Sequence, residues 1–106
     1  MPKYLFEADY SVEGTKGLLK EGGTKRRESV EKSIASLGGK VEAFYFTFGL
    51  RDAILIVDLP DNVSAAAISL AVSASGAVVL ETTPLLTTAD LDQAAKKKVG
   101  YRPPGA

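Results

Sequence analysis

The segment KVEAFYFTFGLRDAILIVDL, residues 40–59, restricts the possible folds of this chain more than any other. Its two halves are dense in β-branched and aromatic residues, which favours β-strands at residues 40–48 and 52–59. The connection around Gly49 and Leu50 is short, so the two strands are predicted to form a hairpin. Gly49 is expected to supply a positive φ in this turn.

Before the hairpin, the pattern predicts a strand and a helical stretch. Residues 3–10 alternate as a strand whose aromatic side chains share one face. Residues 14–37 are mostly helical, with an interruption at Gly22-Gly23. The sequence leaves open whether this pair breaks the helix or only kinks it. Gly38-Gly39 is a helix stop.

Capping residues mark the elements after the hairpin. The expected elements are a helix over residues 62–75, a strand over residues 77–83 and a helix over residues 89–98. Asp61 is placed to cap the first of these helices, and Pro60 ends the strand before it. Thr87 and Asp90 have the spacing of a capping box for the last helix.

The element order βαββαβ plus a terminal helix is that of a ferredoxin-like fold of the α+β class, with a four-stranded antiparallel sheet. At 106 residues the chain is long enough for one such domain. We expect that domain over residues 1–99, followed by an irregular tail over residues 100–106.

In a ferredoxin-like sheet the helices cover one face, and the other face is expected to alternate to polar residues. In this chain both faces of two strands carry apolar residues. The second strand has Ala43, Tyr45 and Thr47 on one face and Phe44, Phe46 and Phe48 on the other. The third strand has Ala53, Leu55 and Val57 on one face and Ile54 and Ile56 on the other. Neither face has the alternating polar residues expected of a solvent-exposed sheet surface. We therefore predict that a second copy of the chain covers the open face, sheet against sheet, in a homodimer or higher oligomer.

Composition excludes several kinds of site. The chain has no cysteine and no histidine, which removes disulfides, thiolate nucleophiles, Cys/His metal sites and imidazole catalysis. Its 13 basic and 13 acidic residues balance, which argues against a general nucleic-acid binder. No metal or cofactor is predicted. The N-terminus lacks an apolar signal core, and the uncharged stretch 63–80 reads as a helix and a strand, so we expect a cytoplasmic protein without a membrane span.

Several patches in this order resemble the GYD-domain family. They are GLL at residues 17–19, LGGKVEAFYFTFG at residues 37–49, Asp52 at the start of a strand, and LPDN at residues 59–62 before an alanine-rich helix. The glycine, tyrosine and aspartate of the family name correspond to Gly49, Arg51 and Asp52, so arginine occupies the tyrosine position. The resemblance covers residues 3–88 and implies a dimeric α/β-barrel. It implies no particular activity, because related barrels include oxygenases, isomerases and stress proteins.

Three carboxylates are the candidate catalytic residues. Glu7 and Asp9 lie two residues apart on a central strand, where they could act as an acid–base pair or bind a cation. The alternative is that they form ion pairs with lysines or arginines across the dimer. Asp52 is expected to accept hydrogen bonds from backbone amides in the turn, and Arg51 to stay in water or pair with an acid. The functional alternative places this pair at the mouth of a pocket.

The candidate ligand-binding residues are Tyr4, Phe6, Arg27, Tyr45 and Arg51. If Thr24 caps a helix, the three cations that follow it occupy the first helical turn and suggest a nearby anion. Arg27 is in phase with the core face of that helix and is expected to reach the aromatic strand residues, for example Tyr45 or Tyr4. The alternative is a solvated helix start whose charges are met by neighbouring glutamates.

Three functions fit these patterns. The preferred one is an oligomeric domain that binds a small, partly apolar molecule between sheet and helices, with an anion as one option. The second is a pure assembly module. An interior filled by Tyr45 and its neighbours would support this function. The third is a cofactor-free oxygenase or isomerase, in which Glu7, Asp9 or Asp52 would be the base.

Overall fold

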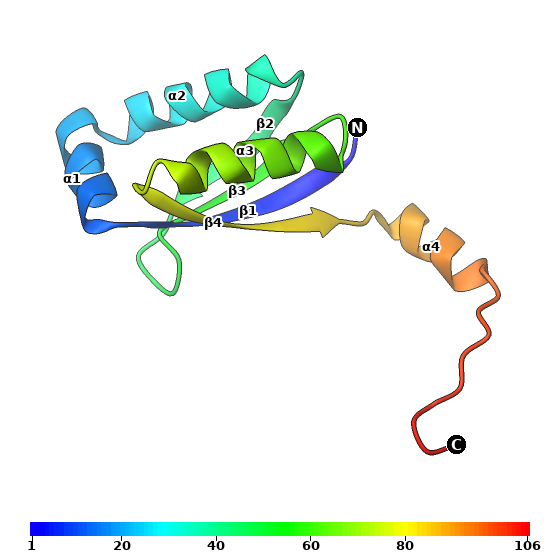
Figure 1. Ribbon diagram of the computed structural model, residues 1–106. Coiled ribbons are helices and arrows are strands. Elements are labelled where there is room, and N and C mark those ends of the chain that lie inside the picture. The colour runs from blue at the N-terminus through cyan, green and yellow to red at the C-terminus, as the bar shows by residue number, and fades with distance from the viewer.

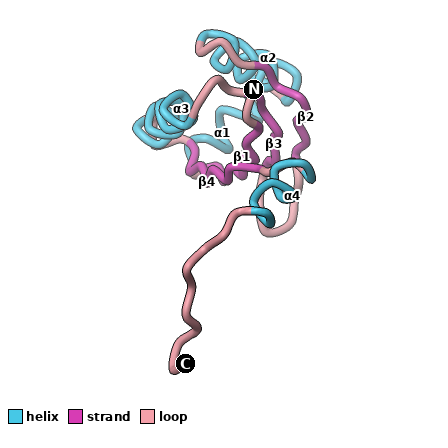
Figure 2. The backbone as a smooth tube through the Cα atoms, turned by 90° about the vertical axis from the view of Figure 1, so that its right-hand side faces the viewer, coloured by secondary structure: helices cyan, strands magenta, loops and turns pink.

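A computed structural model describes all of residues 1–106. The elements, in chain order, are β1 (Lys3–Tyr10), α1 (Val12–Glu21), α2 (Gly23–Ser36), β2 (Lys40–Phe46), β3 (Ala53–Asp58), α3 (Asn62–Ala74), β4 (Val78–Leu85) and α4 (Thr88–Lys96). The strands form one antiparallel sheet in the order β2-β3-β1-β4. Helices α2 and α3 lie on the same face of it, as Figures 1 and 2 show. The predicted α+β, ferredoxin-like fold is confirmed.

Capping side chains set the starts of α3 and α4 as the sequence predicts. The Asp61 carboxylate accepts the Ser64 backbone N–H at 2.8 Å at the start of α3, and this bond lowers the pKa of Asp61. Thr87 and Asp90 form the predicted capping box of α4. Gly22 has a φ of 84°, so the glycine pair breaks the helical stretch into α1 and α2.

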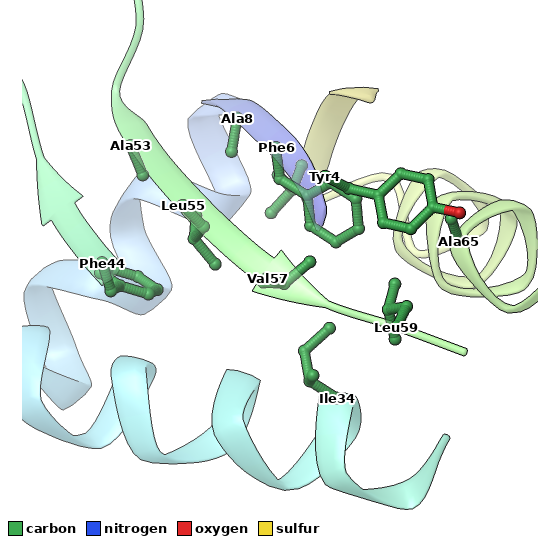
Figure 3. Packing of buried hydrophobic residues seen from close by; sticks show 11 residues of the cluster. Tyr4, Phe6, Ala8, Ile34, Phe44, Ala53, Leu55, Val57, Leu59 and Ala65 are labelled. Atoms are coloured by element: carbon green, nitrogen blue, oxygen red, sulfur yellow. The ribbon is translucent and has the colours of Figure 1, made fainter. Parts of the chain in front are cut away.

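The core lies between the sheet and the two helices (Figure 3). Alternate residues of the central strands β1 and β3 point into it, and α2 and α3 lie over it. Its buried apolar residues are Tyr4, Phe6, Ala8, Ile34, Phe44, Ala53, Leu55, Val57, Leu59, Ala65 and Val78. The Tyr4 hydroxyl is satisfied within this core because it donates to Asn62 Oδ1 at 2.6 Å.

The β2–β3 connection is longer than predicted. Both strands are shorter than expected, and the loop spans residues 47–52. The Thr47 N–H donates to the Asp52 carbonyl at 2.8 Å, which closes the loop at its base. Gly49 is not among the glycines with positive φ, so that prediction was wrong. A loop of this length reverses the chain over several residues and needs no left-handed residue at Gly49.

The second face of the sheet, which we call the open face, is covered by no helix (Figure 2). Its apolar residues include Leu5, Ile54 and Ile56, all partly exposed, and Tyr45 and Val79, which are 71% and 67% exposed. The predicted alternation is therefore confirmed within β2 and β3, whereas Thr47 and Phe48, which it also included, lie in the loop. An apolar surface of this kind is typical of a face that another molecule covers.

Helix α4 and the residues after it extend away from the sheet rather than packing on it (Figure 1). Every residue from 86 to 106 is exposed. We call residues 86–106 the C-terminal arm. No helix in the protein combines the length and apolar content that crossing a membrane requires.

Candidate functional site

An apolar cavity lies between the sheet and the helices. Its free volume is about 70 Å³, and it is partly open to solvent. Its lining residues are Phe6, Ala8, Tyr10, Arg26, Ser29, Val30, Ser33, Ile34, Phe44, Ala53, Leu55, Ile68, Val72, Val78 and Leu80. The strands supply the floor, and α2 and α3 supply opposite walls. Val30, Ile68 and Val72 stay partly exposed because the two helices do not close over the space between them.

Arg26, in the first turns of α2, is the one charged residue in the lining of this cavity. Its Nε is buried and has no hydrogen-bond partner, and Arg26 forms no ion pair in the chain. A buried donor without a partner costs free energy, and more so when the group is charged. Arg26 therefore offers an unsatisfied donor beside an apolar cavity.

The cavity continues into a groove between α1, α2 and α3. Arg26, Tyr10 and Ser33 border both spaces, so the groove leads to the cavity mouth. Glu13 and Glu21 are the acidic residues of the groove, and both lie on α1. The groove thus combines one arginine on α2 with two acids on α1.

The open face carries a separate cluster of charges around Arg51. Its Nη1 donates to Asp9 Oδ2 at 2.9 Å, its Nη2 pairs with Glu81, and its Nε lies 3.4 Å from a Glu7 carboxylate oxygen. These contacts, led by the bond to Asp9, raise the pKa of Arg51. Three acids meet one cation, so the cluster keeps a formal charge of −2.

A second ion cluster lies at the other end of the open face. Lys3 Nζ donates to Asp58 Oδ1 and to Glu42 Oε2, both at 2.8 Å. The register of β2 shifts between Val41 and Ala43, which places Glu42 at an irregularity of the ladder. The hydrogen bond from Lys3 lowers the pKa of Asp58, and the bond from Lys3 to Asp58 raises the pKa of Lys3.

The structure separates the predicted ligand-binding residues between two faces. Tyr4 and Phe6 point to the helix-covered face, and only Phe6 lines the cavity. Tyr45 and Arg51 lie on the open face. The Arg27 guanidinium lies 6.0 Å from the centre of the Phe44 ring and 3.8 Å from Glu31, so it reaches an aromatic strand residue as expected, but that residue is Phe44 rather than Tyr45 or Tyr4. These residues do not form one site.

The predicted catalytic carboxylates lie away from the cavity. Glu7 and Asp9 contact Arg51 of the same chain, so the expected cation comes from the hairpin loop rather than from across a dimer. Asp52 accepts the Tyr10 backbone N–H at 2.8 Å, as expected of an aspartate that binds backbone amides. No group of three or more acids in the protein is placed to hold a metal ion.

Thr24 does not cap a helix. The N-cap of α2 is Gly22, which has no side chain to accept a bond from the first turn. The break at Gly22 starts the helix two residues earlier than that prediction required. Sequence reasoning also passed over Arg26 in favour of Arg27, although Arg26 lies four residues before Val30 and seven before Ser33, on the face that lines the cavity.

Comparisons with known proteins identify a family and nothing further. A family model described as GYD domain matches residues 4–95. Neither the curated proteins nor the solved structures contain a significant match.

Proposed function

The chain belongs to the GYD-domain family, and from this premise we propose that it is a homo-oligomeric domain that binds a small, partly apolar anion between its sheet and its helices. The observation that carries the proposal is the apolar cavity bordered by Arg26. Apolar walls select an apolar body, and a few polar groups at one end fix the orientation of a ligand.

The charge of Arg26 favours an anionic head group on that ligand. A guanidinium presents donors in a planar fork that matches a carboxylate, and a charge-assisted bond is stronger where water is excluded. Glu13 and Glu21 border the groove beyond Arg26, so a ligand with a long anionic tail is disfavoured. The best match is a compact molecule with one carboxylate and an apolar body.

The open face supports the oligomeric part of the proposal. Its central residues Leu5, Ile54 and Ile56 are apolar and not fully buried, and no other part of the chain covers them. A second copy that packs face to face removes this surface from water in both copies at once. The cavity lies on the other side of the sheet, so the two parts of the proposal are testable separately.

The two other functions inferred from the sequence have weaker support. An enzyme that used Glu7, Asp9 or Asp52 as a base would need its substrate near one of them, and none lines the cavity. A pure assembly module would favour an interior filled by Tyr45, which instead lies on the open face and is 71% exposed.

Ligand binding is tested with benzoate, phenylacetate and hexanoate, each beside its neutral amide. We expect the carboxylates to shift the NMR signals of cavity residues such as Phe6 and Leu80, and the amides to bind more weakly. Arg26→Gln removes a charged hydrogen bond of about 1.5–3 kcal/mol, so the dissociation constant is expected to rise roughly tenfold to a hundredfold.

The matched control is Arg27→Gln, the same change one residue later on the same helix. Arg27 lies over the Phe44 ring and outside the cavity lining, so binding is expected to change by less than about twofold. Equal losses in both variants, or carboxylates and amides that all leave the cavity signals unmoved, would overturn the proposed site.

The oligomer is tested by sedimentation. We expect a dimer that Ile56→Lys converts to a monomer, because a lysine at the centre of the open face must be desolvated on association. Leu19→Lys, at an α1 position that is 82% exposed, is the matched control and is expected to leave the dimer intact. A wild-type chain that sediments as a monomer at micromolar concentration contradicts this half of the proposal.

A further inference from the structure

The C-terminal arm has the features of a segment that docks on something. All of its residues are exposed, yet it contains the large apolar residues Leu86, Leu91, Val99 and Tyr101, each more than 60% exposed. Helix α4 within it spans nine residues and has a complete capping box. An isolated helix of this length is marginal in water, so its stability requires a packing partner.

The arm lies on the side of the sheet where a second copy would sit. Figure 1 draws α2 and α3 above the sheet and the arm descending below it, and Figure 2 shows the same relation from the side. The arm leaves the sheet at the end of β4, where Leu85 pairs with Lys3 at the start of β1. It therefore projects from one end of the open face.

The charges of the arm and of the open face are complementary. Residues 96–102, KKKVGYR, carry four cations and no acid. The Arg51 cluster on the open face keeps a formal charge of −2, because Glu7, Asp9 and Glu81 share a single guanidinium. An interface that joins the basic segment to this cluster neutralises both.

The arm does not reach that cluster within its own chain. Asp9 pairs with Val79 near the start of β4, whereas the arm begins after Leu85 at the other end. Six residues of extended strand separate the two ends by about 20 Å, and the arm points away from the sheet (Figure 1). In a dimer whose second copy is rotated end over end, the end of the partner's open face that carries its Arg51 cluster, the acidic end, lies next to the start of the arm.

We propose that the C-terminal arm of each copy packs against the acidic end of the open face of a second copy, with residues 96–102 next to the partner's Arg51 cluster. The two-fold axis then crosses the strands, so that the arm end of one sheet lies over the acidic end of the other. The opposite arrangement stacks two acidic clusters on each other. This inference rests on the proposed dimer and adds an exchanged arm to it.

Cross-linking between two differently tagged copies tests the exchange, and the chain has no native cysteine to interfere. One copy carries Lys98→Cys and the other Glu81→Cys. We expect a mixed disulfide to form at least tenfold faster than with a control partner that carries Lys32→Cys, an exposed position on α2. Equal rates in a dimer verified by sedimentation overturn the arm proposal and leave the dimer standing, whereas a monomeric chain overturns both.

Charge reversal gives a second measurement on the full-length chain. Changing the three lysines at residues 96–98 to glutamate is expected to weaken the dimer about tenfold or more at low salt, and less in 1 M salt, where screening is nearly complete. Reversal of Lys16, Lys20 and Lys25, on the helix side, is the control with the same net charge. If both triple variants weaken the dimer equally, the effect is one of net charge, and the arm proposal is wrong.

Discussion

Two glycines of α1 provide a paired test of how this helix packs. Gly14 and Gly17 lie three residues apart in the same helix, and each can be changed to alanine. A Cβ at Gly17 meets nothing within 4 Å. A Cβ at Gly14 lies 3.0 Å from the Ala77 carbonyl carbon and closer still to its oxygen, inside the separation that non-bonded atoms keep.

Both substitutions gain the same helix-propensity contribution to the free energy of unfolding, and only Gly14→Ala also has an unfavourable packing contribution. Alanine is better than glycine inside a helix by about 1 kcal/mol, so Gly17→Ala is expected to stabilise the protein by up to that amount. At Gly14 the same gain is opposed by displacement of Ala77, whose carbonyl accepts bonds from the Ser11 N–H at 2.9 Å and the Ser11 hydroxyl at 3.2 Å. Overpacking costs about 1–3 kcal/mol and each weakened bond about 1 kcal/mol. We expect Gly14→Ala to destabilise by about 1–2 kcal/mol.

Urea unfolding of the two variants beside wild type measures both effects, read as midpoints at an unchanged slope. The expected difference between the variants is roughly 2–3 kcal/mol, with opposite signs relative to wild type. If Gly14→Ala and Gly17→Ala stabilise equally, then α1 does not lie against the segment before β4 as described.

Three further predictions concern polar contacts. The hydrogen bond from Lys3 lowers the pKa of Asp58, so the stability that this bond contributes is complete above the unfolded pKa of about 4 and is lost as the pH falls through the lower folded pKa. Asp58→Asn should therefore weaken the fall of the unfolding free energy at acid pH, and an unchanged pH dependence argues against this linkage. Arg51→Gln leaves three carboxylates together on the open face, so it should lower stability at low salt and less at high salt, and an effect independent of salt in urea titrations counts against that picture. Tyr4→Phe removes the bond to Asn62 and is expected to cost about 1 kcal/mol by thermal unfolding; no measurable change would show that Asn62 finds another partner.

The sequence was a good guide wherever structure depends on near neighbours. Alternation along residues 3–10 predicted which side chains of β1 face the core, because successive side chains of a strand point to opposite faces. Asp61 and the pair Thr87 and Asp90 predicted their helix starts, since a cap needs only an acceptor a few residues before a free N–H. The family resemblance rested on the same local patches and is confirmed over residues 4–95.

The candidate site was less predictable, because its residues come from distant parts of the chain. Arg27 was preferred over Arg26 from helical phase alone, but a difference of 100° around α2 decides which arginine borders the cavity, and the exact phase depends on how the helix is docked. The length of the β2–β3 loop was missed for a related reason. Asp52 is held by the Tyr10 amide and by the Ala8 carbonyl, contacts with a strand that no local pattern reveals.

The sequence by itself determined the order of strands and helices, the helix stop at Gly38-Gly39 and the division of strand side chains between the two sheet faces, because these follow from propensity, capping and alternation along a few residues. Only the tertiary structure decided that Arg51 joins Glu7, Asp9 and Glu81 in one cluster and that Arg26 stands without a partner at an apolar cavity. The physical reason is that pairing between charges depends on distance in space. The sheet brings Arg51 next to side chains 30 to 44 positions away in the sequence, and the docking of α2 sets which arginine borders the cavity.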